Sequence, residues 1–299
     1  MWTLGELLAW TQNRFTEAGI EAARSDAQHL LAHALGCSRL SLYVRHDEVV
    51  GEDVKARFRE LVRRRLKREP VAYIEGRRGF HAIDLELEVD PRVLIPRPET
   101  EHLVDWLLEE LPFAPTPVRI LDIGTGSGAI ALAVAHHRPE AQVVASDRSP
   151  DALAVARANA ERLAAAVTFV ESDLLAALPV PERGFTAIAA NLPYIRGEDV
   201  DGLQPEVSRF EPRMALDGGE DGLTVIRACI RQVAETAALA PGGALYLEVG
   251  YDQAADVCAE LEAHGFVDVQ TRADYSGIPR VVRGRRADVD APRRSPSDR

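Results

Sequence analysis

The tetrapeptide Asn-Leu-Pro-Tyr at positions 191–194 directly follows FTAIAA (185–190), an apolar run with the length of a buried strand. In open α/β sheets, ligands bind beyond the carboxyl ends of the strands, so this tetrapeptide is expected at a ligand site. Its carbonyl groups suit a planar amide or aromatic amine, because acceptors for both N–H groups orient the nitrogen and favour its nucleophilic, pyramidal form. Asn191 offers a side-chain carbonyl, while Leu192 and Pro193 offer backbone carbonyls. Tyr194 offers a flat face for stacking.

We therefore predict Asn191, Pro193 and Tyr194 as catalytic residues. The substrate is expected to contact all four positions, Leu192 included, and Pro193 would stiffen the loop. The alternative is an ordinary Asn-x-Pro turn, which the position directly after a strand disfavours.

A second motif, Gly124-Thr125-Gly126-Ser127-Gly128, follows the strand-like segment 119–123 and leads into a helical pattern. Glycines let a chain turn sharply and let a ligand approach the backbone. The GxGxG spacing differs from the GxGxxG of dinucleotide-binding folds, and the lysine of an ATP-binding phosphate loop is missing. The motif therefore indicates a ligand without a pyrophosphate, although a simple tight turn would also use these glycines.

Two aspartates favour a nucleoside ligand over a simple turn. Asp147 ends the next strand-like segment, where an acid suits ribose hydroxyls, and Asp173 follows the third, where it could accept from an adenine amino group. S-adenosylmethionine fits this description better than NAD, and Asn191 is expected beside it. The sulfonium of S-adenosylmethionine is already activated, so the methyl transfer requires no base with a tuned pKa. Orientation of the reactants, worth about 7–11 kcal/mol, would supply most of the rate.

The segments that must position these residues alternate between strand and helix, which predicts a parallel sheet with helices on both faces. A helix is expected to open at Ser149-Pro150, and another to span about 222–238, ended by Pro241-Gly242-Gly243. Two late strands without a helix between them are expected to form an antiparallel edge. The expected strands are 119–123, 143–146, 167–170, 185–190, 244–249, 267–271 and 280–283.

The first seventy residues are expected to form a small helical bundle. Thr3 and Glu6 match a capping box, Ser25 and Gln28 repeat this start signal before a helix ending at Gly36, and a third helix is expected over 52–68. The alternation in IDLELEVD (83–90) predicts a strand of a hairpin. The predicted domains are a helical docking domain (1–70), a β-hairpin linker (71–92), a catalytic domain (93–285) and a disordered tail (286–299).

The composition is that of an acidic globular protein. Lys and Arg number 35 and Asp and Glu number 47, a net charge of −12 that disfavours binding to nucleic acid. The stretch 55–68 is nevertheless basic, either as a solvated helix face or as a docking patch for an acidic or RNA-bound partner. The 3 cysteines form no CxxC pair, so we expect no disulfide framework and no metal site. No secretory signal or membrane-spanning run is apparent, and we expect a cytoplasmic monomer.

Taken together, the motifs resemble the HemK/PrmC family of protein-(glutamine-N5) methyltransferases over about residues 1–285. The resemblance rests on the glycine motif and the 191–194 loop, together with REPVAYIEG (68–76), LIPRPETE (94–101), ILDIGTGSGAIALA (120–133) and RFEPRMALDGGEDGL (209–223). It implies a seven-stranded Rossmann-like class I methyltransferase domain, preceded by a helical bundle and a hairpin linker.

The resemblance also implies an activity. The family methylates the glutamine of the Gly-Gly-Gln motif in class 1 peptide chain release factors and thereby modulates translation termination. By position, Gly124 to Gly128, Asp147, Asp173 and Leu174 would bind S-adenosylmethionine, and the 191–194 loop would hold the glutamine. Two positions depart from the family: Leu192 replaces the first proline of NPPY, and Leu174 replaces an aromatic residue.

Several alternatives stay open at this point. The substrate could be a glutamine of a ribosomal protein or, less compatibly with the acidic composition, an adenine of nucleic acid. A non-catalytic nucleoside-binding protein would not need the complete 191–194 loop. Arg97 could shape the glutamine pocket or form a structural salt bridge, and Glu248 has no assigned role. We expect the helical bundle to dock the release factor, because one glutamine in a glycine-rich loop offers little surface.

Overall fold

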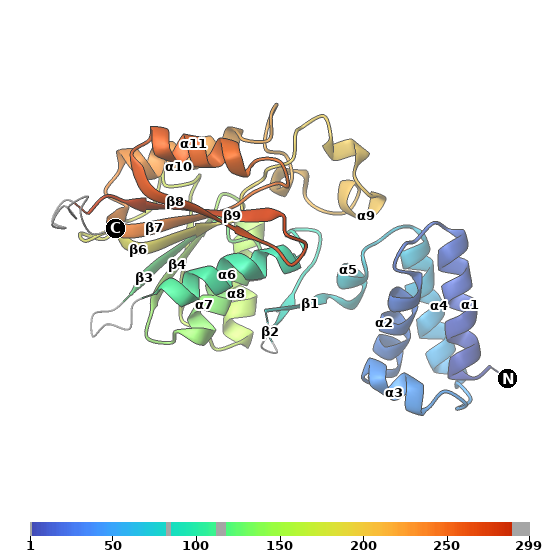
Figure 1. Cartoon of the computed structure of the whole chain (residues 1–299). Helices are drawn as coiled ribbons and strands as arrows, with labels where there is room; N and C mark the ends of the chain where they lie inside the picture. The colour runs from blue at the N-terminus through green and yellow to red at the C-terminus, as the bar shows by residue number, and fades with distance from the viewer. Residues whose placement is uncertain (1, 82–84, 112–117, 289–299) are drawn as a thin grey trace. The chain divides into compact units, whose positions relative to one another are not determined.

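The computed structural model describes residues 2–81, 85–111 and 118–288, which form two compact units. One unit contains the chain up to Arg77 with 89–91 and 203–210; the other contains 78–88, 92–202 and the chain from Glu211 onward. Figure 1 shows the helices of the first unit and the sheet of the second. Positions 83–84 of the expected 83–90 strand and positions 289–299 of the expected tail lie outside the described residues.

The first unit is a bundle of helices around an apolar core that includes Phe15, Leu30 and Leu31. The capping box predicted at Thr3 is confirmed. The predicted start of the second helix at Ser25 was wrong: that helix begins at Ala23 without a side-chain cap. At its other end, Gly36 in the left-handed conformation caps the helix after Leu35. The helices are α1 (Leu4–Glu17), α2 (Ala23–Leu35), α3 (Arg39–Val44), α4 (Glu52–Leu66) and α5 (Val71–Glu75).

The basic stretch 55–68 lies mostly on α4, and part of it belongs to the interior of this unit. The guanidinium of Arg65 is buried, donating to Asp26 at 2.7 Å and pairing with Glu206 at 2.7 Å. Arg68 pairs with the same Glu206 carboxylate at 2.8 Å. Other cations of the stretch, such as Arg57, are exposed, as a solvated helix face requires. The stretch is therefore partly structural and partly solvated.

Removing the buried guanidinium is expected to destabilise the helical unit. Arg65→Met leaves the carboxylates of Asp26 and Glu206 without this partner, and breaking a buried ion pair from one side costs about 3–5 kcal/mol. Denaturant unfolding monitored by circular dichroism measures the loss. The control Arg57→Met, on the exposed face, should stay within about 0.5 kcal/mol of the wild type. Equal losses for the two variants would contradict a structural role for Arg65.

The second unit has a two-stranded sheet, β1 (Arg77–Phe80) with β2 (Leu85–Glu88), and a seven-stranded sheet in the order β5-β4-β3-β6-β7-β9-β8. Neighbours from β5 to β7 are parallel, whereas β9 runs antiparallel to both β7 and β8. The predicted fold class, including the antiparallel edge, is confirmed. The strands are β3 (Arg119–Ile123), β4 (Gln142–Asp147), β5 (Val167–Glu171), β6 (Phe185–Ala190), β7 (Leu239–Glu248), β8 (Phe266–Ala273) and β9 (Pro279–Arg286).

Helices cover both faces of this sheet, as Figure 1 shows. One apolar cluster packs α6, α7 and α8 against one face, and a second packs α10 and α11 against the other. The helices are α6 (Pro98–Glu110), α7 (Ala129–His137), α8 (Pro150–Arg162), α9 (Pro205–Ser208, in the helical unit), α10 (Thr224–Glu235) and α11 (Ala254–Ala263). No helix within 2–81, 85–111 and 118–288 is long and apolar enough to cross a membrane.

Two expected boundaries were wrong. The helix expected over 222–238 spans only Thr224–Glu235, and the Pro-Gly-Gly at 241–243 lies inside β7, where the pairing with β6 shifts register. Proline and glycine are tolerated in strands at such irregularities, so here they mark a bulge and do not end a helix. At the other end, β9 includes Arg286, which pairs with Phe266, so this residue is not part of a tail.

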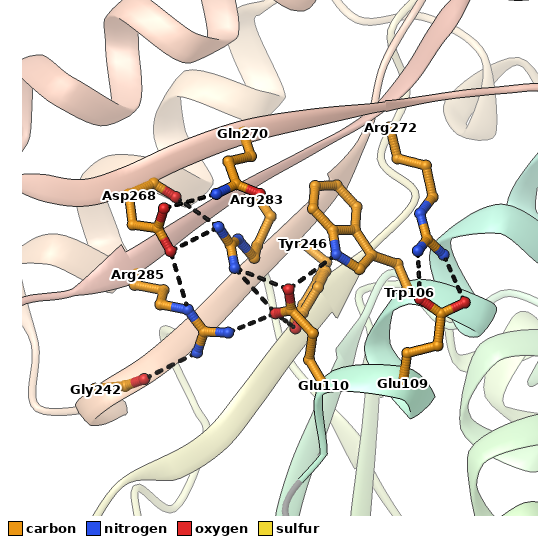
Figure 2. Close-up of polar contacts among 10 residues, drawn as sticks. All are labelled: Trp106, Glu109, Glu110, Gly242, Tyr246, Asp268, Gln270, Arg272, Arg283 and Arg285. Atoms are coloured by element: carbon orange, nitrogen blue, oxygen red, sulfur yellow. Dashed lines mark hydrogen bonds and ion pairs between the residues drawn. The ribbon is translucent and has the colours of Figure 1, made fainter. Parts of the chain in front are cut away.

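Helix α6 is fixed at its carboxyl end by a cluster of polar side chains (Figure 2). Glu110 accepts hydrogen bonds from Trp106 at 3.0 Å, Tyr246 at 2.7 Å and Arg283 at 2.9 Å, and from Arg285 at 2.6 Å. Burial raises the pKa of Glu110, but the bonds from Tyr246 and Arg283 outweigh it and bring the pKa below its usual value. This Glu110 cluster joins α6 to β7 and β9 and so fixes the helix whose first turn reaches the cavity described next.

Candidate active site

A cavity at the carboxyl edge of the parallel strands brings most of the predicted site residues together. Two predicted residues, Gly128 and Tyr194, are outside its described lining. The predicted residues that line it are Gly124, Thr125, Gly126, Ser127, Asp147, Asp173, Leu174, Asn191, Leu192 and Pro193.

The glycine loop has the backbone that only glycine adopts without strain. Gly124, Gly126 and Gly128 have φ values of 72°, 55° and 89°. A Cβ on Gly126 would meet nothing within 4 Å, so the loop presents open backbone at this point. A Cβ on Gly128 would lie 2.9 Å from Leu132, so this glycine serves the packing of α7 and does not face the cavity.

Asp122, at the penultimate position of β3, holds the glycine loop through hydrogen bonds. Its Oδ2 accepts a hydrogen bond from the Thr125 hydroxyl at 2.6 Å and from the Ala131 amide at 3.1 Å. Complete burial raises the pKa of Asp122 to about 7, although both bonds oppose this shift. The carboxyl group thus ties the loop to the start of α7.

Asp147 lies at the end of β4, and each of its carboxylate oxygens already accepts one backbone hydrogen bond. One carboxylate oxygen accepts from the Gly126 amide and the other from the Ser149 amide, each at 2.9 Å. Burial raises its pKa, and the two amides counteract the rise. Each carboxylate oxygen can accept more than one bond, so capacity for hydroxyl groups of a ligand remains.

Asp173 and Leu174 follow β5 and line the cavity beside it. Asp173 is exposed and lines the cavity. Leu174 has φ of 52°, an unusual conformation for a branched residue, and its side chain is buried against the core beneath α10. Strained backbone of this kind persists where the surroundings fix it, often at ligand sites.

The first half of the 191–194 loop is held by contacts with α6 and with the glycine motif. The Asn191 side-chain amide donates to the Thr100 hydroxyl at 3.0 Å. Leu192 is buried and packs toward Gly124, whose Cβ would lie 3.1 Å from its side chain. Leu192 therefore joins the loop to the glycine motif.

The side chain of Tyr194 contacts Glu248, the last residue of β7. Its hydroxyl donates to Glu248 at 3.3 Å, and its backbone carbonyl accepts from the Gln253 side chain at 2.8 Å. Burial, followed by the charge of Glu248, raises the pKa of the phenol. In this position Tyr194 stabilises the loop, and its expected stacking on a substrate stays a prediction.

The chain matches a family model described as the PrmC N-terminal domain at residues 6–76 and one described as a methyltransferase domain at 120–210. A release factor glutamine methyltransferase of Geobacter sulfurreducens is 45% identical over 95% of this chain and 97% of the relative. One of Burkholderia pseudomallei is 46% identical over 87% of this chain and 91% of the relative. The chain belongs to the release factor glutamine methyltransferase family. The solved hMettl16 catalytic domain, in complex with a 3'UTR hairpin, shares the fold, with 16% identity, a TM-score of 0.51, and coverage of 66% of this chain and 74% of its own.

Two segments of this methyltransferase contribute lining residues to which the sequence had assigned no role. They are 92–100, with Thr100, and 212–217, with Met214. Both overlap stretches that carry the resemblance to the family, 94–101 and 209–223, and that resemblance was the signal that could have found them. The remaining lining residues are Ile123, Ala129, Ile130, Arg148, Ser149, Ala152, Ser172 and Val225.

The two segments are joined by a salt bridge. Arg97 donates to the buried Glu211 at 2.5 Å, and Glu211 also accepts from the Ile95 amide at 3.2 Å. Burial raises the pKa of Glu211, which the Arg97 charge opposes. Of the two roles considered for Arg97, the structure shows the salt bridge, which fixes the two segments of the methyltransferase beside the cavity.

Proposed function

We propose that this chain transfers a methyl group from S-adenosylmethionine to the side-chain nitrogen of the glutamine in the Gly-Gly-Gln motif of class 1 release factors. The observation that carries the proposal is that one cavity joins the glycine loop and Asp147 to Asn191 and Pro193. A donor bound at one end would meet an acceptor held at the other. The names of the curated relatives support the choice of substrate.

The residues present fit the proposed donor. Gly126 leaves room for a ligand against the backbone, and Asp147 keeps acceptor capacity for ribose hydroxyls. Asp173 is exposed to the same cavity and can accept from an adenine amino group. When bound, S-adenosylmethionine supplies a methyl group activated by a sulfonium. The buried Leu174 would replace aromatic stacking on the adenine by aliphatic packing.

The 191–194 loop has the acceptors that an amide nucleophile needs. The side-chain oxygen of Asn191 and the backbone carbonyls of Leu192 and Pro193 can accept both N–H groups of the glutamine and orient its nitrogen. The new N–C bond forms as the S–C bond of the donor breaks, and the extra proton on nitrogen then leaves to solvent. This chemistry depends on orientation, which can save about 7–11 kcal/mol of the barrier.

The test uses the purified full-length protein, methyl-labelled S-adenosylmethionine and a purified release factor. We expect label on the wild-type factor and none on a factor whose Gly-Gly-Gln glutamine is replaced by alanine. Mass spectrometry of the labelled peptide locates the methyl group on the glutamine nitrogen. Label on the alanine variant, or on ribosomal protein or DNA instead, would overturn the proposed substrate.

A further inference from the structure

We infer that Gln253 is a positioning residue for glutamine methylation. Its side-chain amide holds the backbone carbonyl of Tyr194 and thereby fixes the neighbouring carbonyl of Pro193, one of the proposed acceptors for the substrate nitrogen. Gln253 is 4% exposed and lies outside the described lining of the cavity. The inference rests on the proposed function and adds to it a residue to which the sequence motifs assign no role.

The Gln253 side chain joins two segments at the carboxyl edge of the sheet. Its Nε2 donates to the Tyr194 carbonyl at 2.8 Å, in the loop after β6. Its Oε1 accepts from the Gly250 amide at 2.9 Å, in the turn after β7. The residue is also the N-cap of α11, where its backbone carbonyl accepts from the Val257 amide at 3.0 Å. One buried amide group therefore ties the 191–194 loop to the end of β7 and the start of α11.

The two partners fix the orientation of this amide. A backbone N–H can only donate and a backbone carbonyl can only accept, so the oxygen of Gln253 faces Gly250 and its NH₂ group faces Tyr194. A carboxylate of the same shape would present an acceptor to the Tyr194 carbonyl, and an aliphatic side chain would pair with neither partner. Because the site is buried, such unpaired groups are unfavourable, which makes this position selective for a neutral amide.

Close packing leaves the Tyr194 carbonyl little freedom. Gly222 has φ of 77°, and a Cβ on it would lie 2.5 Å from the Tyr194 oxygen and 2.7 Å from the Gln253 Nε2. A Cβ on Gly250 would lie 2.9 Å from the Gln253 Oε1. The Tyr194 hydroxyl also donates to Glu248 at 3.3 Å. The end of β7 and the turn after it therefore hold both the side chain and the backbone of Tyr194.

Holding Tyr194 also restricts the Pro193 carbonyl. The proline ring fixes φ, so this carbonyl reorients mainly by rotation of the peptide unit that Pro193 shares with Tyr194. A Cβ on Gly218 would lie 2.7 Å from the Pro193 oxygen, and the Ile195 amide donates to the Leu216 carbonyl at 3.0 Å. The 216–218 backbone thus contacts both neighbours of Tyr194, and Gln253 holds Tyr194 itself. Loss of the Gln253 bond would release the peptide that carries the proposed acceptor.

The principal test is Gln253→Met in the full-length enzyme, assayed with release factor and methyl-labelled donor below the Tm of the variant. Methionine has a similar length and lacks the amide. We expect kcat to fall roughly 10–100-fold, because misplacing a reacting group by about 1 Å costs about 100-fold. The KM for release factor should change less than about 3-fold, as expected when the lost interaction acts in the transition state. The dissociation constant for S-adenosylhomocysteine should also stay within about 3-fold, because the glycine loop and Asp147 belong to other segments.

Gln253→Glu tests the donated hydrogen bond through rescue by pH. The protonated carboxyl can accept from Gly250 and donate to Tyr194, as the amide does, whereas the ionised carboxylate has no proton to donate. Burial raises the pKa of an introduced carboxyl. The ratio of variant to wild-type kcat should therefore approach unity at low pH and fall toward that of Gln253→Met as the pH rises through this pKa. A purely structural role would lower Tm in the variants without this pH-dependent change in the kcat of the folded enzyme.

Taking the ratio to the wild type at each pH removes titrations that the two enzymes share. The segments that contact the Gln253 amide carry titratable and charged groups of their own, which are present in both enzymes. They are Glu248 at the end of β7, Arg280 on β9, Tyr251 and Asp252 before α11, Asp256 in α11, Arg196 in the loop after β6, paired with Asp252, and Asp221 beside Gly222, paired with Arg227. The matched control is Gln142→Glu at the exposed start of β4, at the opposite edge of the sheet, and its kcat should equal that of the wild type at every pH.

The outcomes are distinguishable from those of the proposed function. A wild-type enzyme that labels no release factor overturns the function itself. An active wild type with a kcat within about 3-fold in Gln253→Met, or with an equal loss of S-adenosylhomocysteine affinity in that variant, overturns only the positioning role. If Gln253→Met does not fold, Gln253→Glu decides: a ratio of kcat values that does not change with pH would refute the inference.

Discussion

Replacing Asn191 by alanine is expected to lower kcat for release factor methylation by roughly 100–1000-fold, the effect of losing one oriented polar contact in a comparable transition state. Its side chain lines the cavity and has a described hydrogen bond to Thr100. The variant loses the proposed acceptor for the substrate nitrogen, while the backbone carbonyls of Leu192 and Pro193 remain. Single-turnover measurements with saturating donor isolate this loss from product release.

The same change should leave folding and donor binding almost intact. Asn191 is partly exposed, and removing its side chain deprives Thr100 of one donor without opening a cavity in the core. We expect the free energy of unfolding to change by no more than about 1 kcal/mol, the value of one hydrogen bond. Asn13→Ala, on the exposed face of α1, is the matched control and should be neutral in both assays. A loss of donor affinity as large as the loss of kcat would show that Asn191 binds cofactor and does not direct the substrate.

Much of the cavity could be predicted from the sequence because its residues follow strands directly. The glycine loop, Asp147, Asp173 and Asn191 all come within a few residues of a strand end, and parallel strands bring such positions to one edge. Local spacing therefore decides their location. The chemistry of the loop could be inferred in the same way, because it depends on residue types at adjacent positions.

The contacts that hold the site residues in place could not be predicted in this way, because they join segments that are distant in the sequence. Thr100 meets Asn191 across 91 positions of sequence, and Tyr194 meets Glu248 across 54. Tyr194 illustrates the difficulty: an aromatic ring in a loop favours stacking on a ligand, yet its hydroxyl has a buried partner in β7. No pattern within the 191–194 segment encodes that partner.

The predicted helix boundaries were wrong for a related reason, because they too depend on contacts with distant segments. The Pro-Gly-Gly segment at 241–243 has the composition of a helix stop, and it became part of β7 because pairing with β6 accommodates an irregularity there. Ser25 was expected to cap a helix that instead begins at Ala23. Its neighbour Asp26 pairs with Arg65, a residue 39 positions away, so tertiary contacts stabilise the first turn of this helix.

A methyl group added at Gly218 is expected to reduce kcat by about 100-fold, because misplacing a reacting group by about 1 Å has effects of this size. A Cβ at this position would lie 2.5 Å from the Gly222 carbonyl oxygen and 2.7 Å from that of Pro193. Both are backbone atoms, so neither can yield by rotating a side chain. The Gly218 amide also donates to the Ile195 carbonyl at 2.8 Å, which ties this glycine to the end of the 191–194 loop. Gly218→Ala must therefore displace the Pro193 carbonyl, one of the proposed acceptors for the substrate nitrogen.

The effect of Gly218→Ala should be confined to the acceptor end of the cavity. Binding of S-adenosylhomocysteine, measured by calorimetry, should stay within about 3-fold of the wild type, because the glycine loop after β3 and Asp147 of β4 belong to other segments. Gly202→Ala is the matched control: its Cβ would meet nothing within 4 Å, and its φ is not in the left-handed region. If both alanine variants turn over at the wild-type rate, the exact placement of the Pro193 carbonyl does not govern methylation. If only Gly218→Ala is slow while its donor binding is normal, the backbone of this loop contributes to the reaction alongside the Asn191 side chain.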